Sequence, residues 1–376
     1  MKDKNRISIF YRGPLERSRL GFLLELFATT GKRVRLIWLL PHPKFQNENN
    51  RVLEPFMESY PEIEYQVISA KFTEVFSTRS KVLKLMKQEN NGVTVCIGFT
   101  APYFLPGSKS GVHIWCINGI PEESLLHRNT FSKRLEVSLK WKLLGMLYTP
   151  NLVITVSDRM SRYVSEKVSC PNFFAIPLCV DLDRFSTKNR IERKYFTYSG
   201  SGAPWQNLTQ LSEIWVELFK LDSSLKFRVI SRDARAKILG KYLPVEAIEF
   251  VGTSDLDELA SLMDQAEAGF LIRKDSLVNR VSFPTKLSEY LASGAWAVVS
   301  DIDWDVSKYI KKNQVGVLVN PQAASSLIAK EILEARRRFK QDEGIDQRLK
   351  NTVVELGKKH WLKVGNGILM DSGYFI

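Results

Sequence analysis

Two charged side chains near the start of an expected helix could bind an anionic ligand. The stretch SFPTKLSEYLASG, residues 282–294, places Lys286 and Glu289 three residues apart, and residues at this spacing share one face of a helix. A lysine in the first turn opposes the helix dipole, at a cost of roughly a few tenths of a kcal/mol. A bound phosphate would remove that cost, and the carboxylate could accept hydrogen bonds from sugar hydroxyls. The alternative is an ion pair on a solvated helix face.

The residues around this pair suit a helix start beside a ligand. Pro284 fits the first turn, where a missing N–H costs nothing, and Ser282 or Thr285 could cap free N–H groups. The buried stripe of the helix is expected to consist of Leu287, Tyr290 and Leu291.

A glycine-containing loop follows an expected strand at 195–200. Gly200, Ser201 and Gly202 separate this strand from the next helix, and backbone N–H groups in such loops commonly bind phosphate. Gln206 could line the same site or begin the helix. The alternative for the loop is a tight structural turn.

Arg273 ends another apolar run, AGFLIR, and a polar loop follows it. A guanidinium at the carboxyl end of a strand can hold phosphate through its fork of donors. The alternative is an ordinary surface arginine.

The positions of these candidate residues are set by a regular alternation of strands and helices. Expected strands are 6–10, 34–40, 64–70, 93–99, 112–117 and 152–157, followed by 195–200, 226–231, 248–252, 268–273, 296–300 and 316–320. Most are apolar on both faces, as parallel strands covered by helices are. The pattern predicts an α/β protein with two doubly wound, Rossmann-like parallel-sheet domains that face each other across a cleft.

The polar stretch FSTKNRIERK, residues 185–194, marks the expected break between the domains. We therefore expect an N-terminal domain over 1–183 and a C-terminal domain over 184–350. A last segment, 351–376, is expected to cross back to the first domain.

Composition narrows the class of partner. The net charge is +13, and residues 1–180 hold 25 Lys and Arg against 15 Asp and Glu, a net charge of +10. A basic half favours an acidic partner, such as an anionic membrane or a phosphorylated substrate. We expect no nucleic-acid partner, because the basic charge is diffuse and no base-stacking platform is visible.

Localisation is expected to be cytoplasmic, with peripheral contact at the inner face of the cell membrane as a further expectation. No apolar run approaches the ~20 residues that span a bilayer, and the N-terminus does not resemble a signal peptide. The four cysteines form no CxxC pair, which is typical of free thiols in a reducing compartment.

Three segments carry a family resemblance. They are ITVSDRMSRYV with FFAIPLCVDLDRF, then YSGSGAPWQNL, and last FLIRKDSLVNRVSFPTKLSEYLASGAWAVVSD. Over roughly 150–320 the sequence resembles the retaining glycosyltransferases of the two-domain GT-B fold, of the glycosyl transferase group 1 type. In particular, it is similar to the large bacterial group that builds envelope and capsular polysaccharides, including lipopolysaccharide.

The resemblance implies a role for each matching residue. Glu289 would bind the ribose of a nucleotide sugar, while Lys286 and Arg273 would hold its diphosphate and act as the catalytic cations. The loop at 200–202 would pass near the phosphates and the transferred sugar, and residues 282–285 would shape the helix start under the phosphates. The expected reaction is a retaining, hexosyltransferase-type transfer that needs no metal and no cofactor.

The sequence also departs from the family pattern. Val281 stands where many members have a second, sugar-facing glutamate, and Trp205-Gln206-Asn207 replaces a basic pair after the glycine loop. Arg273 is expected to compensate for that missing charge.

The acceptor, a glycan or a polyprenyl-linked glycan, is expected to bind the first domain. Candidate residues are Gly13 and Arg17 after the first strand, and Asn118 and Glu122 in the loop NGIPEE. The segment 127–148 alternates basic and apolar residues around Trp141, so it could lie on an anionic membrane. The alternative is a core helix with one solvated face.

Two other functions remain open on the same fold. One is a nucleotide-sugar epimerase, which Val281 disfavours because epimerases need acids near the anomeric carbon. The other is a non-catalytic partner protein.

Overall fold

The computed structural model describes residues 5–13, 19–40, 53–89, 92–105, 111–185 and 193–375. The chain forms two compact units. Unit 1 consists of Met1–Pro177 with Leu362–Ile376, and unit 2 consists of Leu178–Trp361. The junction expected after residue 183 therefore lies within unit 2.

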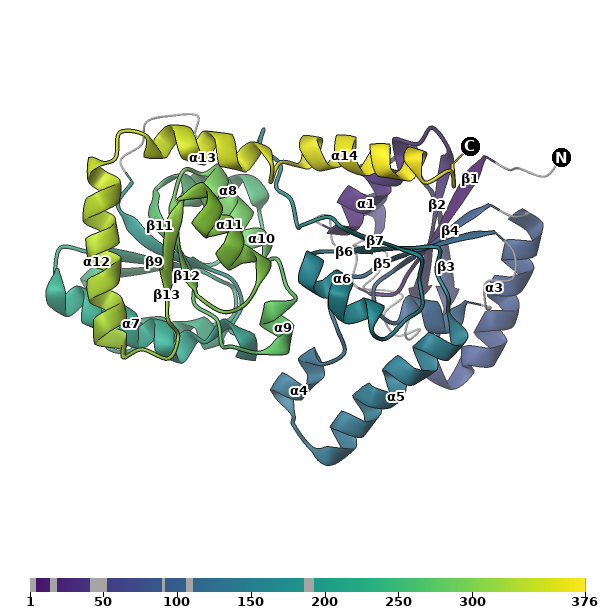
Figure 1. The fold of residues 1–376 in the computed structure, drawn as a ribbon, viewed down its shortest axis with the longest axis horizontal. Coiled ribbons are helices and arrows are strands. Elements are labelled where there is room, and N and C mark those ends of the chain that lie inside the picture. Colours follow the sequence, from purple (N-terminus) through teal and green to yellow (C-terminus); the bar gives the residue numbers. More distant parts are fainter. Residues whose placement is uncertain are drawn as a thin grey trace. The chain divides into compact units, whose positions relative to one another are not determined.

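Unit 1 is built on a seven-stranded parallel sheet with the strand order β3-β2-β1-β4-β5-β6-β7 (Figure 1). Its strands are β1 (Arg6–Tyr11), β2 (Arg33–Leu40), β3 (Glu64–Ser69), β4 (Val93–Ile97), β5 (Val112–Cys116), β6 (Leu152–Thr155) and β7 (Asn172–Ala175). All but β7 were expected. This edge strand has four residues, none of them fully buried, and its apolar run is short and ends at Pro177.

The described helices of unit 1 surround this sheet. They are α1 (Arg19–Ala28), α3 (Val75–Glu89), α4 (Glu123–His127), α5 (Phe131–Leu147), α6 (Asp158–Ser165) and most of α14 (Lys358–Asp371). Figure 1 shows α14, in yellow, beside α1. Gly365 of α14 sits close to Leu26 and Ile176, and the ring of Phe375 stacks on Phe27 with centroids 6.5 Å apart.

Unit 2 has a six-stranded parallel sheet with the order β10-β9-β8-β11-β12-β13. Its strands are β8 (Tyr195–Ser199), β9 (Lys226–Ile230), β10 (Ile248–Val251), β11 (Ala266–Leu271), β12 (Trp296–Ser300) and β13 (Gly316–Val319). The chain reverses its direction across the sheet between β10 and β11, so the sheet is doubly wound, and such a reversal leaves a crevice at the carboxyl ends of the central strands.

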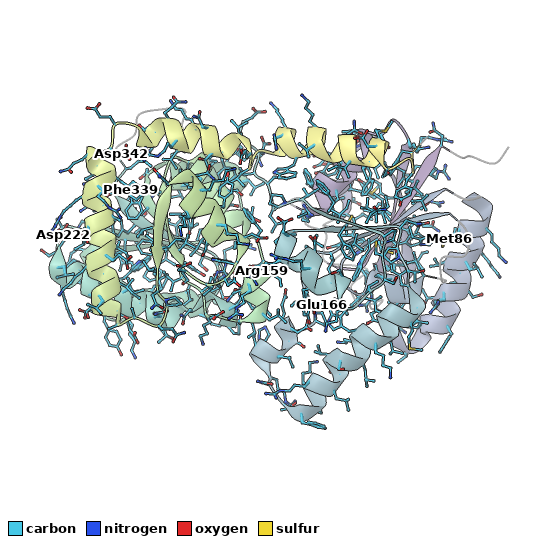
Figure 2. The ribbon with its side chains drawn as sticks, in the orientation of Figure 1. Met86, Arg159, Glu166, Asp222, Phe339 and Asp342 are labelled. Atoms are coloured by element: carbon cyan, nitrogen blue, oxygen red, sulfur yellow. The ribbon has the colours of Figure 1, made fainter. Side chains whose placement is uncertain are left out.

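Helices cover both faces of the second sheet (Figure 1). They are α7 (Leu208–Leu221), α8 (Leu256–Asp264), α9 (Leu277–Arg280), α10 (Thr285–Ala292), α11 (Asp305–Asn313), α12 (Ser325–Gln341) and α13 (Ile345–Val354). Helices α7 and α12 pack together over a core that contains Trp215 and Ile332. Phe339 of α12 packs against Trp296 of β12, with ring centroids 5.0 Å apart (Figure 2).

Candidate anion-binding site at the carboxyl ends of the second sheet

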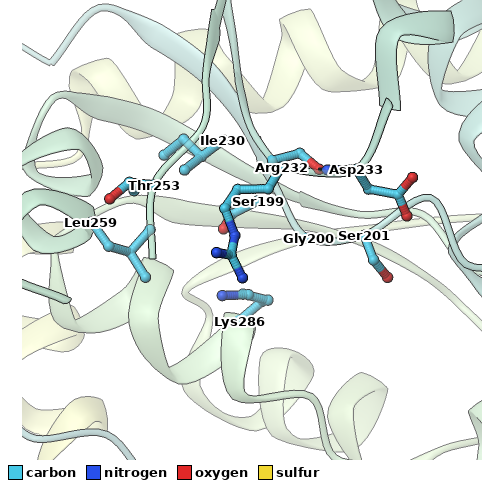
Figure 3. Close-up of a pocket in the computed structure, with 10 residues that line it drawn as sticks. Ser199, Gly200, Ser201, Ile230, Arg232, Asp233, Thr253, Leu259 and Lys286 are labelled. Carbon is cyan, nitrogen blue, oxygen red and sulfur yellow. Dashed lines mark hydrogen bonds between the residues drawn. The ribbon is translucent and has the colours of Figure 1, made fainter. Parts of the chain in front are cut away.

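A pocket of about 410 Å³ lies within unit 2, where β8, β9 and β10 end (Figure 3). Its walls come from the loops after these strands and from two helices, α8 and α10. The lining residues are Ser199, Gly200, Ser201, Ile230, Ser231, Arg232, Asp233, Thr253, Leu259 and Lys286. Carboxyl ends of parallel strands meet at one edge of a sheet, so segments far apart in the sequence share this pocket.

The glycine loop requires glycine for steric reasons. Gly200 has a φ of +151°, and a Cβ atom there would lie 3.0 Å from the Tyr198 Oη atom and 3.4 Å from the Gln206 Nε2 atom. A Cβ atom on Gly202 would lie 2.3 Å from the Cβ atom of Arg235. Contacts within the protein itself therefore require glycine at these two positions.

Both glycine N–H groups are already bonded within the protein. Gly200 donates to the carbonyl of Ile230 at 3.1 Å, and Gly202 donates to the Asp233 Oδ2 atom at 2.8 Å. Asp233 also accepts from the Arg235 guanidinium, and these hydrogen bonds hold the pKa of the Asp233 carboxyl well below its usual value. The loop is thus fixed by its neighbours, and its glycine amides are not free to bind a ligand.

Lys286 and Glu289 form the predicted pair on one face of α10. The Lys286 Nζ atom lies 2.9 Å from the Glu289 Oε2 atom. Glu289 is 7% exposed, and Lys286 is half-buried and lines the pocket. The pair therefore lies in a partly enclosed site and is not an exposed surface ion pair.

Tyr290 fixes α10 against the end of β8. Its hydroxyl accepts a hydrogen bond from the Ser199 N–H group at 2.7 Å, and the side chain is fully buried. A Cβ atom on Gly269 of β11 would lie 2.1 Å from the Tyr290 ring, so only glycine leaves room for this ring. The contact sets the position of Lys286 relative to the glycine loop.

Arg273 is buried near the carboxyl ends of β11 and β12. It is 5% exposed, its N–H group donates to the Ser300 Oγ atom at 2.8 Å, and burial lowers the pKa of its guanidinium to about 10. Among the described residues, the Arg273 Nε atom has no hydrogen-bond partner. Arg273 is not among the lining residues of the pocket.

The start of α10 differs from the capping prediction. Pro284 is the N-cap residue, without a side-chain cap, and Thr285 is the first helical residue. The Ser282 hydroxyl donates to the carbonyl of Asn279 at 2.9 Å, so it turns back toward α9. The prediction that Ser282 or Thr285 caps α10 was wrong, because Ser282 completes the preceding turn and Thr285 is already inside the helix.

Asn279, a residue that was not predicted, connects the turn after the glycine loop to α9. It is 1% exposed, and its Nδ2 atom donates to the carbonyls of Lys274 and Trp205 at 2.8 and 3.2 Å. This links α9 to the short 3-10 turn Pro204–Gln206, in which Gln206 is buried. Val281 is also buried, at 3% exposure.

Arg232 and Asp233 were not predicted. Ser231 separates them from the end of β9, and the segment SRDARAK contains no glycine, so it lacks the pattern that marked the loop after β8.

The acceptor-side candidates lie in unit 1. Arg17 lies outside the described residues. The Gly13 carbonyl accepts from the Trp38 Nε1 atom at 2.9 Å, and Asn118 is exposed near the start of the loop after β5.

Glu122 is held by two helices of unit 1. Its Oε1 atom accepts a hydrogen bond from the Trp141 Nε1 atom at 2.8 Å and a short one from the Tyr163 hydroxyl. Glu122 therefore connects the loop after β5 to α5 and α6, which is a structural role for a residue selected as an acceptor candidate.

Neither a metal cluster nor a membrane-spanning helix is found in the part of the chain that the structure describes. No three His, Cys, Asp or Glu side chains there lie together as metal ligands would. None of the described helices combines the length and apolar character needed to cross a bilayer.

Comparison with known sequences locates the match in unit 2. Residues 180–351 match the family described as glycosyl transferases group 1, and this range contains the whole pocket. No curated protein matches the sequence.

Comparison with solved structures covers nearly the whole chain. A glycosyltransferase from Rickettsia africae superposes with a TM-score of 0.69 at 14% identity, over 98% of this chain and 99% of that one. A sucrose-phosphate synthase from Thermosynechococcus elongatus gives 0.67 at 13% identity, over 98% of each chain. The lipopolysaccharide outer core galactosyltransferase WaaB gives 0.66 at 12% identity, over 97% of this chain and 99% of that one.

The fold is therefore the GT-B fold, with two Rossmann-like domains on parallel sheets. These structural neighbours share the fold at 12–14% identity, and the family match over 180–351 confines the likeness to glycosyl transferases group 1 to unit 2.

Proposed function

We propose that the protein is a retaining, metal-independent glycosyltransferase that moves a sugar from a nucleotide-diphosphate donor to a hydroxyl group. The acceptor is a glycan or a polyprenyl-linked glycan, and the product belongs to a cell-surface polysaccharide. The observation that carries the proposal is the Lys286–Glu289 pair, 2.9 Å apart on α10, with Lys286 lining a pocket inside the segment that matches glycosyl transferases group 1.

Two parts of the donor, its diphosphate and its ribose, would be bound by different residues. Lys286 binds the diphosphate, and the buried Glu289 accepts hydrogen bonds from the ribose hydroxyls. Arg273, buried near the carboxyl ends of β11 and β12 in the same unit, adds further positive charge at this edge of the sheet. A pocket of about 410 Å³ lies in the range of roughly 300–1,000 Å³ that small-molecule sites occupy.

The proposed chemistry exchanges one bond at the anomeric carbon for another. The bond from this carbon to the diphosphate oxygen breaks, and a bond to the acceptor oxygen forms on the same face. The acceptor proton passes to a donor phosphate oxygen. Negative charge grows on the leaving diphosphate, and preorganised cations stabilise that charge without reorganisation during the reaction.

Membrane association would bring a lipid-linked acceptor to the enzyme at the inner face of the cell membrane. Helix α5 carries apolar side chains that remain largely exposed in unit 1: Phe131, Leu135, Leu139, Leu143 and Met146. Four cations, Lys133, Arg134, Lys140 and Lys142, share the helix with a single acid, Glu136. A helix with apolar and basic faces suits an anionic lipid surface.

The experiment that tests the proposal compares donor use by the wild type and Lys286→Ala. A panel of nucleotide sugars is first screened by thermal shift, because a ligand at 100 times its Kd adds about 2.7 kcal/mol to the free energy of unfolding. Sugar transfer to a polyprenyl-linked acceptor extract is then measured with the best donor. We expect Lys286→Ala to lower the transfer rate by about 100-fold or more, since the lost cation faces developing charge.

Lys312→Ala is the matched control, because Lys312 is an exposed lysine on α11 of the same unit. It should transfer sugar at the wild-type rate. Equal transfer by Lys286→Ala and the wild type would refute the donor site. A wild type that binds nucleotide sugars but only interconverts their epimers, or does neither reaction, would support the epimerase or the non-catalytic alternative.

A further inference from the structure

A second cation of the pocket has no role in the proposal above. Arg232 lies two residues after the end of β9 and lines the pocket together with Lys286 of α10. Figure 3 shows the Arg232 guanidinium pointing toward the Lys286 amino group across the pocket. The two side chains come from opposite walls, one from a loop at the sheet edge and the other from a helix.

The protein gives these two cations unequal partners. Lys286 pairs with Glu289, whereas Arg232 has no ion pair or hydrogen bond to its side chain within the described ranges. The one carboxylate that lines the pocket, Asp233, is bonded to Arg235 and to the Gly202 amide. Because Asp233 is bonded to these two groups, it does not neutralise the charge of Arg232.

Two like charges that face each other repel, and the repulsion grows as water is excluded from the space between them. An anion bound between the two cations attracts both of them, so the net interaction becomes favourable. Ser201 lines the same pocket, and its N–H group has no acceptor among the described residues, so a neutral donor is available on a lining residue.

We propose that Arg232 binds the diphosphate of the donor, opposite Lys286, and is a second binding residue for the leaving group; this inference rests on the proposed function. Arginine presents a fork of donors that matches two phosphate oxygens, whereas lysine acts as a point charge. A diphosphate is long enough to offer separate oxygens to both walls, and the Asp233–Gly202 hydrogen bond holds the loop that carries Arg232 against the glycine loop.

The test measures equilibrium binding of three nucleoside diphosphates, UDP, GDP and ADP, and of uridine, guanosine and adenosine. The proteins are the full-length wild type, Arg232→Ala, Arg232→Lys and the control Arg337→Ala. Arg337 is an exposed arginine on α12 of the same unit. Unfolding of each variant, followed by circular dichroism, shows that it is folded.

For the nucleoside diphosphate that the wild type prefers, we expect Arg232→Ala to weaken binding by about tenfold or more, because a charge-assisted hydrogen bond is lost. Arg232→Lys should recover part of this loss, and Arg337→Ala should bind as the wild type does. Affinity for the matching nucleoside should stay within about twofold in all variants.

Two results would overturn the inference while leaving the proposed function intact. One is diphosphate binding by Arg232→Ala within twofold of the wild type. The other is an equal loss for the diphosphate and its nucleoside, which would indicate a structural role. A wild type that binds none of the diphosphates would instead overturn the proposed function, and the inference with it.

Discussion

Among single residues, Tyr290 connects the chemistry of the site to the packing of unit 2. Its hydroxyl accepts from the Ser199 N–H group at 2.7 Å, and its ring fills the space that Gly269 leaves open on β11. Burial raises the pKa of the Tyr290 hydroxyl above its usual range, so it stays protonated and neutral. Lys286 and Glu289 are placed correctly only if this contact holds α10 against β8.

We predict that Tyr290→Phe lowers the free energy of unfolding by about 1–3 kcal/mol, because it leaves the buried Ser199 N–H group without an acceptor. Chemical denaturation measures this change. Tyr242→Phe is the control, since Tyr242 is 67% exposed, and it should unfold as the wild type does. Equal stability of the two variants would mean that the Ser199 contact contributes nothing.

Among elements, α5 of unit 1 is divided into a packed face and an open face. Val137, Trp141 and Leu144 are buried, and the Trp141 ring contacts Phe99 with centroids 4.9 Å apart. The opposite face exposes Phe131 and Met146, at 84% and 72%. Exposed apolar side chains that gather on one surface commonly mark an interaction site.

We predict that the protein sediments with vesicles containing anionic lipid at low salt, and far less with neutral vesicles. Each cation near the surface contributes about 1 kcal/mol, and salt screens this attraction. Leu139→Glu should weaken binding, because it puts a negative charge in the apolar face.

The control for the vesicle experiment is Leu327→Glu, which changes an exposed leucine on α12 of unit 2. This variant should sediment like the wild type. If the wild type stays in solution with anionic vesicles at low salt, the membrane proposal for α5 fails.

For the whole molecule, the chain leaves unit 1, forms unit 2 and returns. Residues from Leu362 onward belong to unit 1, where Leu369 and Phe375 are buried. The Tyr374 hydroxyl donates to the Asn151 carbonyl at 3.2 Å and lies 3.0 Å from the Asn172 Nδ2 atom, which donates to it. The C-terminal residues thus help to complete the core of unit 1, although most of that core comes from much earlier in the sequence.

We predict that Phe375→Ala destabilises unit 1 by about 3–5 kcal/mol, because it removes a buried ring that stacks on Phe27. Nucleotide binding by unit 2 should be unchanged, which calorimetry with the preferred nucleoside diphosphate measures. Met370→Ala, at a 43% exposed position, is the control. A wild-type unfolding profile for Phe375→Ala would show that the end of the chain is not needed by unit 1.

The sequence alone determined the alternation of strands and helices, because buried parallel strands read as apolar runs and the helices between them keep their own periodicity. It also placed Lys286 beside Glu289, since spacing along one helix fixes which side chains share a face. β7 was not predicted, because its apolar run is short and ends at Pro177.

Only the tertiary structure decided what surrounds that pair. Arg232 and Asp233 enter the pocket because β8 and β9 pair in parallel, so their following loops meet at one edge. The sequence does not show the partners of the glycine amides, but in the structure Gly202 donates to Asp233. Arg273, a candidate phosphate-binding residue, is buried and is not among the lining residues of the pocket. Contacts between segments far apart in the chain are set by sheet order and packing, which no local pattern records.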